Sequence, residues 1–500
     1  MGATFYRGGA PFFYILLIPH AYDRCMHPSL RTGDIFFGIA TAFLFGVFAA
    51  NKGWDLVALG VAGMVCVVAV ILCSARSRGW RKFAAFIFTA AVAGASYYYG
   101  YIGWRAAHTH LPAGKSAAFF GVVAEEPKAA GNFTMMALSL SRPYAGTLDI
   151  FTAPNSTEFH YGDELWIKGS VSVESDASEP AAMFMPQLHV ISEHDGFWLK
   201  EMLIDLKAAI VQKIAQALPA DQAALLTGIL IGTTGTVNAA QKAQMEASGT
   251  SYIVNMYGYK IALITFALTA ALTGRLPRRA LLWITLATIA LFVTASGGAI
   301  SAVRAAVMGS FAVIARGTGR VFSARNAVTF AALGMVLLNA TLLTDAAFQL
   351  SFLSFLGIYY LGPPIDHFFR WTDGGALQWK EHAMLSLATN LAILPIVMST
   401  FGEFSLTSFV SNILIMIPWL AVIVLGALTA FFGFVAPALA FVAAQVVSVL
   451  LQYELFIIHI FAAMTIPMPV VFGSAFAVAL YYGILIIFAH YYAAPPQENN

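Results

Sequence analysis

The sequence has few charged residues and few cysteines. Charged side chains make up 10% of its 500 residues and hydrophobic ones 59%, whereas soluble domains carry a charge on about a quarter of their residues. This shortage of charge excludes an ordinary soluble enzyme. The cysteines number three, Cys25, Cys66 and Cys73, which excludes a disulfide framework and a cysteine-based metal site.

Sequence motifs typical of enzymes are missing as well. There is no nucleophile elbow, no HExxH zinc motif and no Gly-rich dinucleotide fingerprint. Residues 114–116 read Gly-Lys-Ser, like the end of a phosphate-binding loop, but Thr109 stands where the first glycine of that loop belongs. His108 and His110 have no third metal ligand nearby. We therefore predict a protein that is not an enzyme and that holds neither a metal nor a cofactor.

The sequence is rich in long hydrophobic runs. The first three occupy 35–50, 55–73 and 83–102, and their lengths are about what is needed to cross a bilayer. The loop before the third run is purely basic, so the positive-inside rule places it in the cytoplasm and residue 104 outside. Its basic residues are Arg76, Arg78, Arg81 and Lys82.

Nine more hydrophobic runs follow from residue 252 onward. Several are short or interrupted by glycine, and such segments can be re-entrant instead of spanning. We therefore predict a polytopic α-helical membrane protein with about ten to twelve spans. The nine runs are 252–272, 280–298, 299–315, 327–344, 346–361, 383–400, 405–432, 435–460 and 470–489.

The segment between the two hydrophobic regions is acidic and rich in strand-forming residues. Residues 115–205 contain 13 acidic and five basic side chains. Short runs of β-branched and aromatic residues alternate there with Pro, Gly, Asn and Asp, and Tyr161-Gly162-Asp163 predicts a tight turn before a strand. We expect a small extracytoplasmic β-barrel of the OB type, followed within 197–219 by an amphipathic helix on the membrane surface.

These observations divide the chain into five expected regions. They are 1–104 with about three transmembrane helices, 105–196 as the extracytoplasmic OB-like β domain, 197–235 as amphipathic or interfacial helices, 236–490 as a transmembrane bundle, and 491–500 as a short polar tail.

Eight ionisable or amide side chains lie within otherwise hydrophobic runs. Such groups are costly in a membrane unless they face a partner or a water-filled path. Each one therefore marks either a pathway or a structural bond between helices. Asp345 and Gln349 are four residues apart and share one helical face. The eight residues are Asn255, Lys260, Arg304, Asp345, Gln349, Asn390, Asn412 and Glu454.

Four segments around these polar residues make the sequence resemble the ComEC family, the inner-membrane DNA-uptake channels of natural transformation. The most specific string is Asp-Ala-Ala-Phe-Gln-Leu-Ser-Phe at 345–352, because its polar residues have fixed offsets within a span. The order of the regions is also similar over nearly the whole chain. The four segments are 247–260, 304–320, 345–361 and 387–419.

The resemblance implies that single-stranded DNA passes through the bundle into the cytoplasm, and that the OB-like domain handles it outside. Alternatively, the aromatic residues of that domain pack in the barrel core instead of contacting bases. The acidity of the domain also argues against electrostatic binding of DNA. The candidate path residues are Lys260, Arg304, Asp345, Gln349, Asn390 and Asn412, and the candidate base-stacking residues are Trp166, Phe133 and Tyr144.

The sequence departs from the family in two respects. Two histidines of the family's second segment are replaced by Tyr252 and Lys260, of which Lys260 still supplies a cation. Many members also carry a C-terminal metallo-β-lactamase-like nuclease domain, whereas this sequence ends in 491–500. We therefore expect a separate nuclease as a partner. We also expect a cytoplasmic ATP-driven motor, because the chain has no nucleotide-binding loop of its own.

Two other functions stay open at this point. The chain could be a structural or assembly membrane protein that kept the fold without DNA transport, or a transporter of small solutes. All three functions place it in the bacterial inner membrane as a multi-pass protein.

Overall fold

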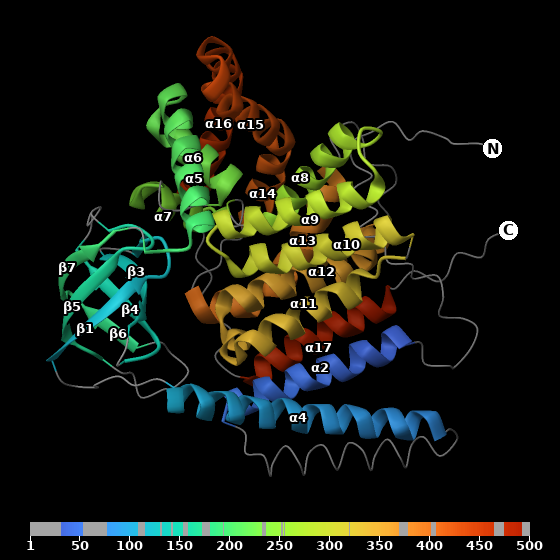
Figure 1. The fold of residues 1–500 in the computed structure, drawn as a ribbon. Coiled ribbons are helices and arrows are strands. Elements are labelled where there is room, and N and C mark those ends of the chain that lie inside the picture. Colours follow the sequence, from blue (N-terminus) through green and yellow to red (C-terminus); the bar gives the residue numbers. More distant parts are fainter. Residues whose placement is uncertain are drawn as a thin grey trace.

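The computed structural model is mostly helical, with one separate β-sheet domain beside the helical bundle (Figure 1). It describes residues 32–53, 78–108, 116–130, 133–141, 144–153, 159–172, 181–193, 195–232, 237–251, 254, 256–319, 321–369, 379–401, 407–464 and 475–492.

Two long N-terminal helices lie side by side along one edge of the bundle (Figure 1). They are α2 (Thr32–Asn51) and α4 (Arg78–His108). Glycines allow the two backbones to touch, because a Cβ on Gly46 would lie 1.9 Å from the Ala91 carbonyl oxygen, and one on Gly94 2.1 Å from that of Phe43. The predicted spans 35–50 and 83–102 are thus helical, and 55–73 lies outside the described residues.

The acidic insert folds into the predicted β-rich domain. Its strands are β1 (Ser116–Val123), β2 (Lys128–Ala130), β3 (Phe133–Leu140), β4 (Thr147–Thr152), β5 (Glu164–Ser170), β6 (Ala181–Phe184) and β7 (Gln187–Ser192). The strand order is β6-β4-β3-β1-β5-β7, with β2 paired to β3. The pairing of β4 with β6 is parallel, and the other strand pairs are antiparallel. Two hydrogen bonds of 2.9 and 3.0 Å between Ser172 and Ala182 also join the chain after β5 to β6.

Alternating hydrophobic residues form the core of this domain. One face of each central strand is fully buried, as period-2 patterning requires. The predicted turn at 161–163 is confirmed: Gly162 has a φ of +92°, and the buried Asp163 carboxylate accepts a 2.6 Å hydrogen bond from the His160 amide. The largest core residues are Phe119, Met136, Leu138, Leu148, Ile150, Leu165, Ile167 and Met183.

Helix α5 (Trp198–Ala217) connects the sheet domain to the bundle. Near its start, Lys200 donates 2.8 Å to the Ala124 carbonyl oxygen and lies 4.2 Å from the Tyr161 ring. The buried Lys207 forms an ion pair with Glu126 of the sheet domain. One side of α5 packs against α6 and α15, so this helix contacts both parts of the protein.

The bundle consists of the helices that follow α5. They are α6 (Ala220–Ile231), α7 (Ala239–Ala247), α8 (Tyr257–Leu272), α9 (Arg278–Ala295), α10 (Ile300–Thr318), α11 (Ala324–Leu338), the 3₁₀ helix η3 (Ala340–Thr344), α12 (Ala346–Phe369), α13 (Trp379–Phe401), α14 (Ser408–Met416), α15 (Trp419–Val435), α16 (Pro437–Ala463) and α17 (Ala475–Tyr491).

Six helices in the described part of the chain are long and apolar enough to cross a membrane. Helices α14 and α15 form a seventh candidate if this pair, bent by 53°, is one span. The predicted ten to twelve full spans are not reached there, because several runs are divided. Run 327–344 becomes α11 and η3, 405–432 becomes α14 and α15, and 252–272 yields the 16-residue helix α8.

Two hydrophobic cores hold the bundle together. One joins α5, α6, α14, α15 and α16, with Trp419 among its largest fully buried side chains. The other joins α2, α4, α10, α11 and α12. An ion pair of Arg325 with Asp34 adds a polar contact between α11 and α2.

Candidate nucleic-acid interface

The most notable cation of the bundle is Arg304, on the second turn of α10. This helix begins directly after Gly297 and Gly298, whose left-handed φ values of +74° and +67° allow the chain to reverse after α9. The side chain of Arg304 reaches α12, where its Nε donates a 2.7 Å hydrogen bond to Ser351 Oγ.

The remaining contacts of Arg304 are with soft and aromatic groups. Its guanidinium carbon lies 5.8 Å from the ring centroids of both Phe352 and Phe355, and Nη1 lies 3.7 Å from Met308 Sδ. No carboxylate pairs with Arg304 among the residues that the structure describes. The positive charge is thus held by a hydroxyl and two rings, and it lacks a compensating anion.

Asp345 and Gln349 both stabilise the start of α12. Asp345 Oδ1 accepts a 3.0 Å hydrogen bond from the Phe348 amide, which is the contact of a helix N-cap. Gln349 Nε2 donates 3.0 Å to the Leu343 carbonyl oxygen. Asp345 is exposed at the end of the helix. Both side chains therefore make capping contacts where η3 ends and α12 begins. These contacts also account for the spacing of four residues between Asp345 and Gln349.

Lys260 is buried where α6 ends. Its ammonium donates to the carbonyl oxygens of Val254 at 2.8 Å and Gly228 at 3.2 Å, and it lies 4.6 Å from the Tyr257 ring. The Tyr257 hydroxyl donates 3.1 Å to the carbonyl oxygen of Gly232, the left-handed cap of α6. Lys260 and Tyr257 thus satisfy carbonyls of a helix end that is closed off from solvent.

The two asparagines of the predicted path have different surroundings. Asn390 Nδ2 donates to Ser386 of its own helix, at 3.0 Å to the carbonyl oxygen and 3.3 Å to Oγ. Asn412 is 5% exposed, and its Oδ1 has no hydrogen-bond partner. Apart from Asp345 and Gln349, no described hydrogen bond or ion pair joins two of the six predicted path residues.

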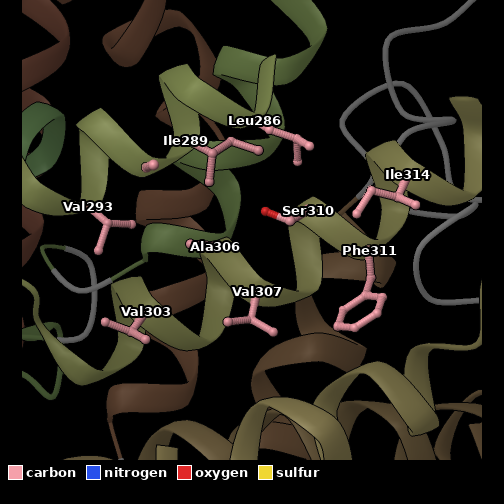
Figure 2. A pocket seen from close by; sticks show the side chains of 10 residues that line it. Leu286, Ile289, Val293, Val303, Ala306, Val307, Ser310, Phe311 and Ile314 are labelled. Atoms are coloured by element: carbon pink, nitrogen blue, oxygen red, sulfur yellow. The ribbon is translucent and has the colours of Figure 1, made fainter. Parts of the chain in front are cut away.

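A groove between α9 and α10 has a volume of about 390 Å³ (Figure 2). Ser310 is the polar side chain among the ten that line it. A surface of this composition suits hydrocarbon better than a phosphate backbone. The labelled apolar lining residues are Leu286, Ile289, Val293, Val303, Ala306, Val307, Phe311 and Ile314.

The sheet domain carries a cluster of three phenylalanines on its outer face, here called the aromatic patch: Phe133, Phe151 and Phe184. The rings of Phe151 and Phe184 are stacked, with centroids 4.8 Å apart and planes 12° apart. The Phe133 ring stands edge-on to both, at 6.5 and 6.4 Å. Phe133 is 36% and Phe184 59% exposed, so aromatic surface is available to a ligand.

The other two predicted stacking residues lie elsewhere. Tyr144 packs edge-on against the core residue Phe119 at 5.2 Å, beside the buried cluster of the domain. Trp166 on β5 is half-buried, with its ring 5.6 Å from that of His189. Sequence reasoning missed Phe151 and Phe184. Strand alternation could have found them, since Phe151 lies between the buried Ile150 and Thr152 on β4 and Phe184 follows the buried Met183 on β6.

Carboxylates accompany the aromatic patch. Asp149 lies on the outward face of β4, two residues before Phe151, and pairs in register with Ala137. The insert as a whole has 13 acidic and five basic side chains. The patch is therefore suited to contact bases by stacking and not to attract phosphates.

The bundle matches a known protein family. The sequence profile of the family described as Competence protein matches residues 229–495, more than half of the chain. The match includes α8 to α17 and therefore all six predicted path residues. Searches of the curated proteins and of the solved structures find no significant match. The extent of the family match shows that this membrane protein belongs to the competence protein (ComEC) family.

Proposed function

We propose that this chain is an inner-membrane channel that moves single-stranded DNA into the cytoplasm during natural transformation. The observation that carries the proposal is the environment of Arg304. A guanidinium within a family-matched span, without a paired carboxylate among the described residues, is costly unless an anion visits it. A DNA phosphate is such an anion, and Phe352 and Phe355 beside the guanidinium could contact the bases.

The proposed role of the sheet domain is to receive DNA outside the cytoplasm as an OB-type barrel. Its strand order, the parallel pairing of β4 with β6 and the Ser172–Ala182 bridge support this assignment. If β2 is counted as an accessory strand, β3 and β4 are the second and third strands of that barrel. In OB folds, oligonucleotides bind to the face formed by the second and third strands. Phe133 and Phe151 lie on these two strands, β3 and β4.

The transport itself is proposed to be non-enzymatic. Each nucleotide carries one negative charge, and an inside-negative potential opposes its entry by about 2.3 kcal/mol per charge per 100 mV. The chain has no nucleotide-binding loop to supply this energy. The proposed partners are therefore a cytoplasmic ATP-driven motor and, for degradation of the second strand, a separate nuclease.

The test is uptake of labelled DNA into the cytoplasm of a transformable host that expresses variants of this chain. We expect Arg304→Ala to reduce uptake by about tenfold or more, the effect of losing roughly 1.4 kcal/mol of favourable interaction. Arg304→Lys should retain part of the uptake because it keeps the charge. The matched control is Arg278→Ala, since Arg278 is exposed at the start of α9.

Membrane insertion of each variant is checked by immunoblot of the membrane fraction. If Arg304→Ala inserts normally and DNA uptake equals that of the wild type, Arg304 is a packing residue and the channel proposal loses its main support. If deletion of the whole gene leaves uptake unchanged, the proposed function itself is wrong.

A further inference from the structure

The buried carboxyl group of Glu454 has no hydrogen-bond partner among the residues that the structure describes. Glu454 is 1% exposed, and neither carboxyl oxygen makes a hydrogen bond. It lies near the middle of α16, one of the six candidate spans, in a buried stripe with Val447, Leu451 and Ile458. A carboxylate in such surroundings is far less stable than in water, so the neutral acid or a bound partner is required.

Two further buried polar groups without partners lie near the same level of the bundle. Helices α15 and α16 are joined at Ala436 and pack against each other as a hairpin. Trp419 is 17 residues before Ala436 and Glu454 is 18 after it, so both lie roughly 26 Å from the turn. Trp419 is 1% exposed, and its indole Nε1 has no acceptor.

The third group is the side chain of Asn412 on α14. The hydroxyl of Tyr453, next to Glu454, donates 3.2 Å to the carbonyl oxygen of Leu414, which places this part of α16 beside α14. Asn412 lies on the buried side of that helix, three residues before the core residue Ile415, and its Oδ1 has no partner among the described residues. Ile415 of α14, Trp419 of α15 and Leu451 of α16 belong to one buried cluster, so the three helices that carry the indole N–H, the amide oxygen and the carboxyl group share one core.

No charged side chain of the described neighbouring helices compensates Glu454. Helices α14 and α15 contain no ionisable residue. On α6 and α7, Asp221, Lys242 and Glu246 are exposed. On α5 the buried Lys207 is paired with Glu126. His459 on α16 itself is exposed, and Lys260 on α8 donates to backbone carbonyls.

We propose that Glu454, Trp419 and Asn412 form a buried, hydrated site that binds and releases a proton within the transmembrane bundle. A water molecule can accept from the indole N–H and donate to the amide oxygen, so it satisfies both orphan groups. When a proton arrives and converts this water to hydronium, one hydronium O–H bond breaks and the Glu454 carboxylate forms a carboxyl O–H bond. On release the carboxyl O–H bond breaks and the proton returns to the water. No electrons are transferred.

A metal cation fits the same groups poorly. Hard cations take six or more oxygen ligands, whereas the described side chains offer one carboxylate and one amide oxygen. The indole N–H also presents its positive end, which would repel a cation but stabilises a water oxygen. The site thus goes beyond the proposed passage of DNA, because its ligand is a proton and it does not include Arg304, which carries the channel proposal.

The test is infrared difference spectroscopy of the purified full chain in detergent, recorded between acidic and alkaline pH. We expect a carboxylic-acid C=O band that disappears as the pH rises and shifts in deuterated water. Glu454→Gln, which changes the volume of the side chain little, should abolish this band. Glu246→Gln, which alters an exposed carboxylate on the neighbouring α7, should leave it unchanged.

A second variant tests the proposal even if Glu454→Gln does not fold. Trp419→Phe removes the indole donor and keeps an aromatic ring in the core, so the band should shift in frequency and titrate at a different pH. The proposal is overturned if the band persists in Glu454→Gln, if it is present at every pH, or if sodium instead of pH controls its appearance. None of these outcomes depends on DNA uptake, so this site and the channel are judged separately.

Discussion

Removing the most exposed ring of the aromatic patch should weaken binding of single-stranded DNA. In Phe184→Ala the ring that stacks on Phe151 at 4.8 Å is lost. Stacking of one base on an aromatic side chain contributes about 1 to 3 kcal/mol. The dissociation constant should therefore rise by about 5- to 150-fold. Because Phe184 is 59% exposed, the substitution should affect the stability of the domain little.

The assay is fluorescence anisotropy of a labelled oligothymidine with the purified full chain. The matched control is Val190→Ala, which shortens an exposed apolar residue on β7, at the opposite end of the strand order. Binding should also depend only weakly on salt, since the acidic domain neutralises few phosphates. An unchanged dissociation constant in Phe184→Ala, or an equal loss in Val190→Ala, would refute base stacking at this patch.

Three further predictions concern the packing of the bundle and the sheet domain. Lys260→Met should destabilise the protein by about 1 to 3 kcal/mol, because it leaves the Val254 carbonyl without this donor and removes one of the two donors to the Gly228 carbonyl. Thermal unfolding in detergent measures this, and an unchanged midpoint would show that Lys260 is not a structural contact. Gly94→Ala should lower the free energy of unfolding by about 1 to 3 kcal/mol, because the added Cβ forces α4 away from α2. The control is Gly100→Ala on the same helix, which has open space around it and should leave the unfolding midpoint unchanged. Lys207→Met should remove the ion pair with Glu126 and destabilise the contact of α5 with the sheet domain by about 1 to 2 kcal/mol. Amide hydrogen exchange in residues 124–127 should then become faster. Unchanged exchange would contradict the role of Lys207 in holding α5 to the sheet domain.

Much of the fold follows from the sequence because its two signals are strong. Long hydrophobic runs predict helices, and alternating short runs predict the strands of the insert. The number of spans does not follow, since the breaks in the runs have local causes. Asn339 caps η3 through a 3.1 Å bond to the Thr341 amide and so separates it from α11. Pro418 lies between α14 and α15, where the chain bends.

The candidate site was less predictable because it depends on contacts between distant parts of the chain. The sequence singles out the polar residues within hydrophobic runs, and their role in a DNA path stays a prediction, but the sequence does not give their partners. Lys260 contacts Gly228, 32 residues away, and Arg304 contacts Ser351, 47 residues away. Such pairs arise from helix packing, which periodicity does not specify. The roles of Asp345 and Gln349 as helix caps could have been inferred, since an aspartate three residues before an amide donor is a common N-cap.

The attachment of α5 at both ends has a mechanical consequence. Its first half is anchored to the sheet domain by Lys200 and Lys207, and Ile214 in its second half is fully buried in the core formed with α15 and α16. A helix of 20 residues is about 30 Å long and resists stretching through its backbone hydrogen bonds. If DNA is held at the sheet domain as proposed above, tension on the strand is therefore carried along α5 into the bundle.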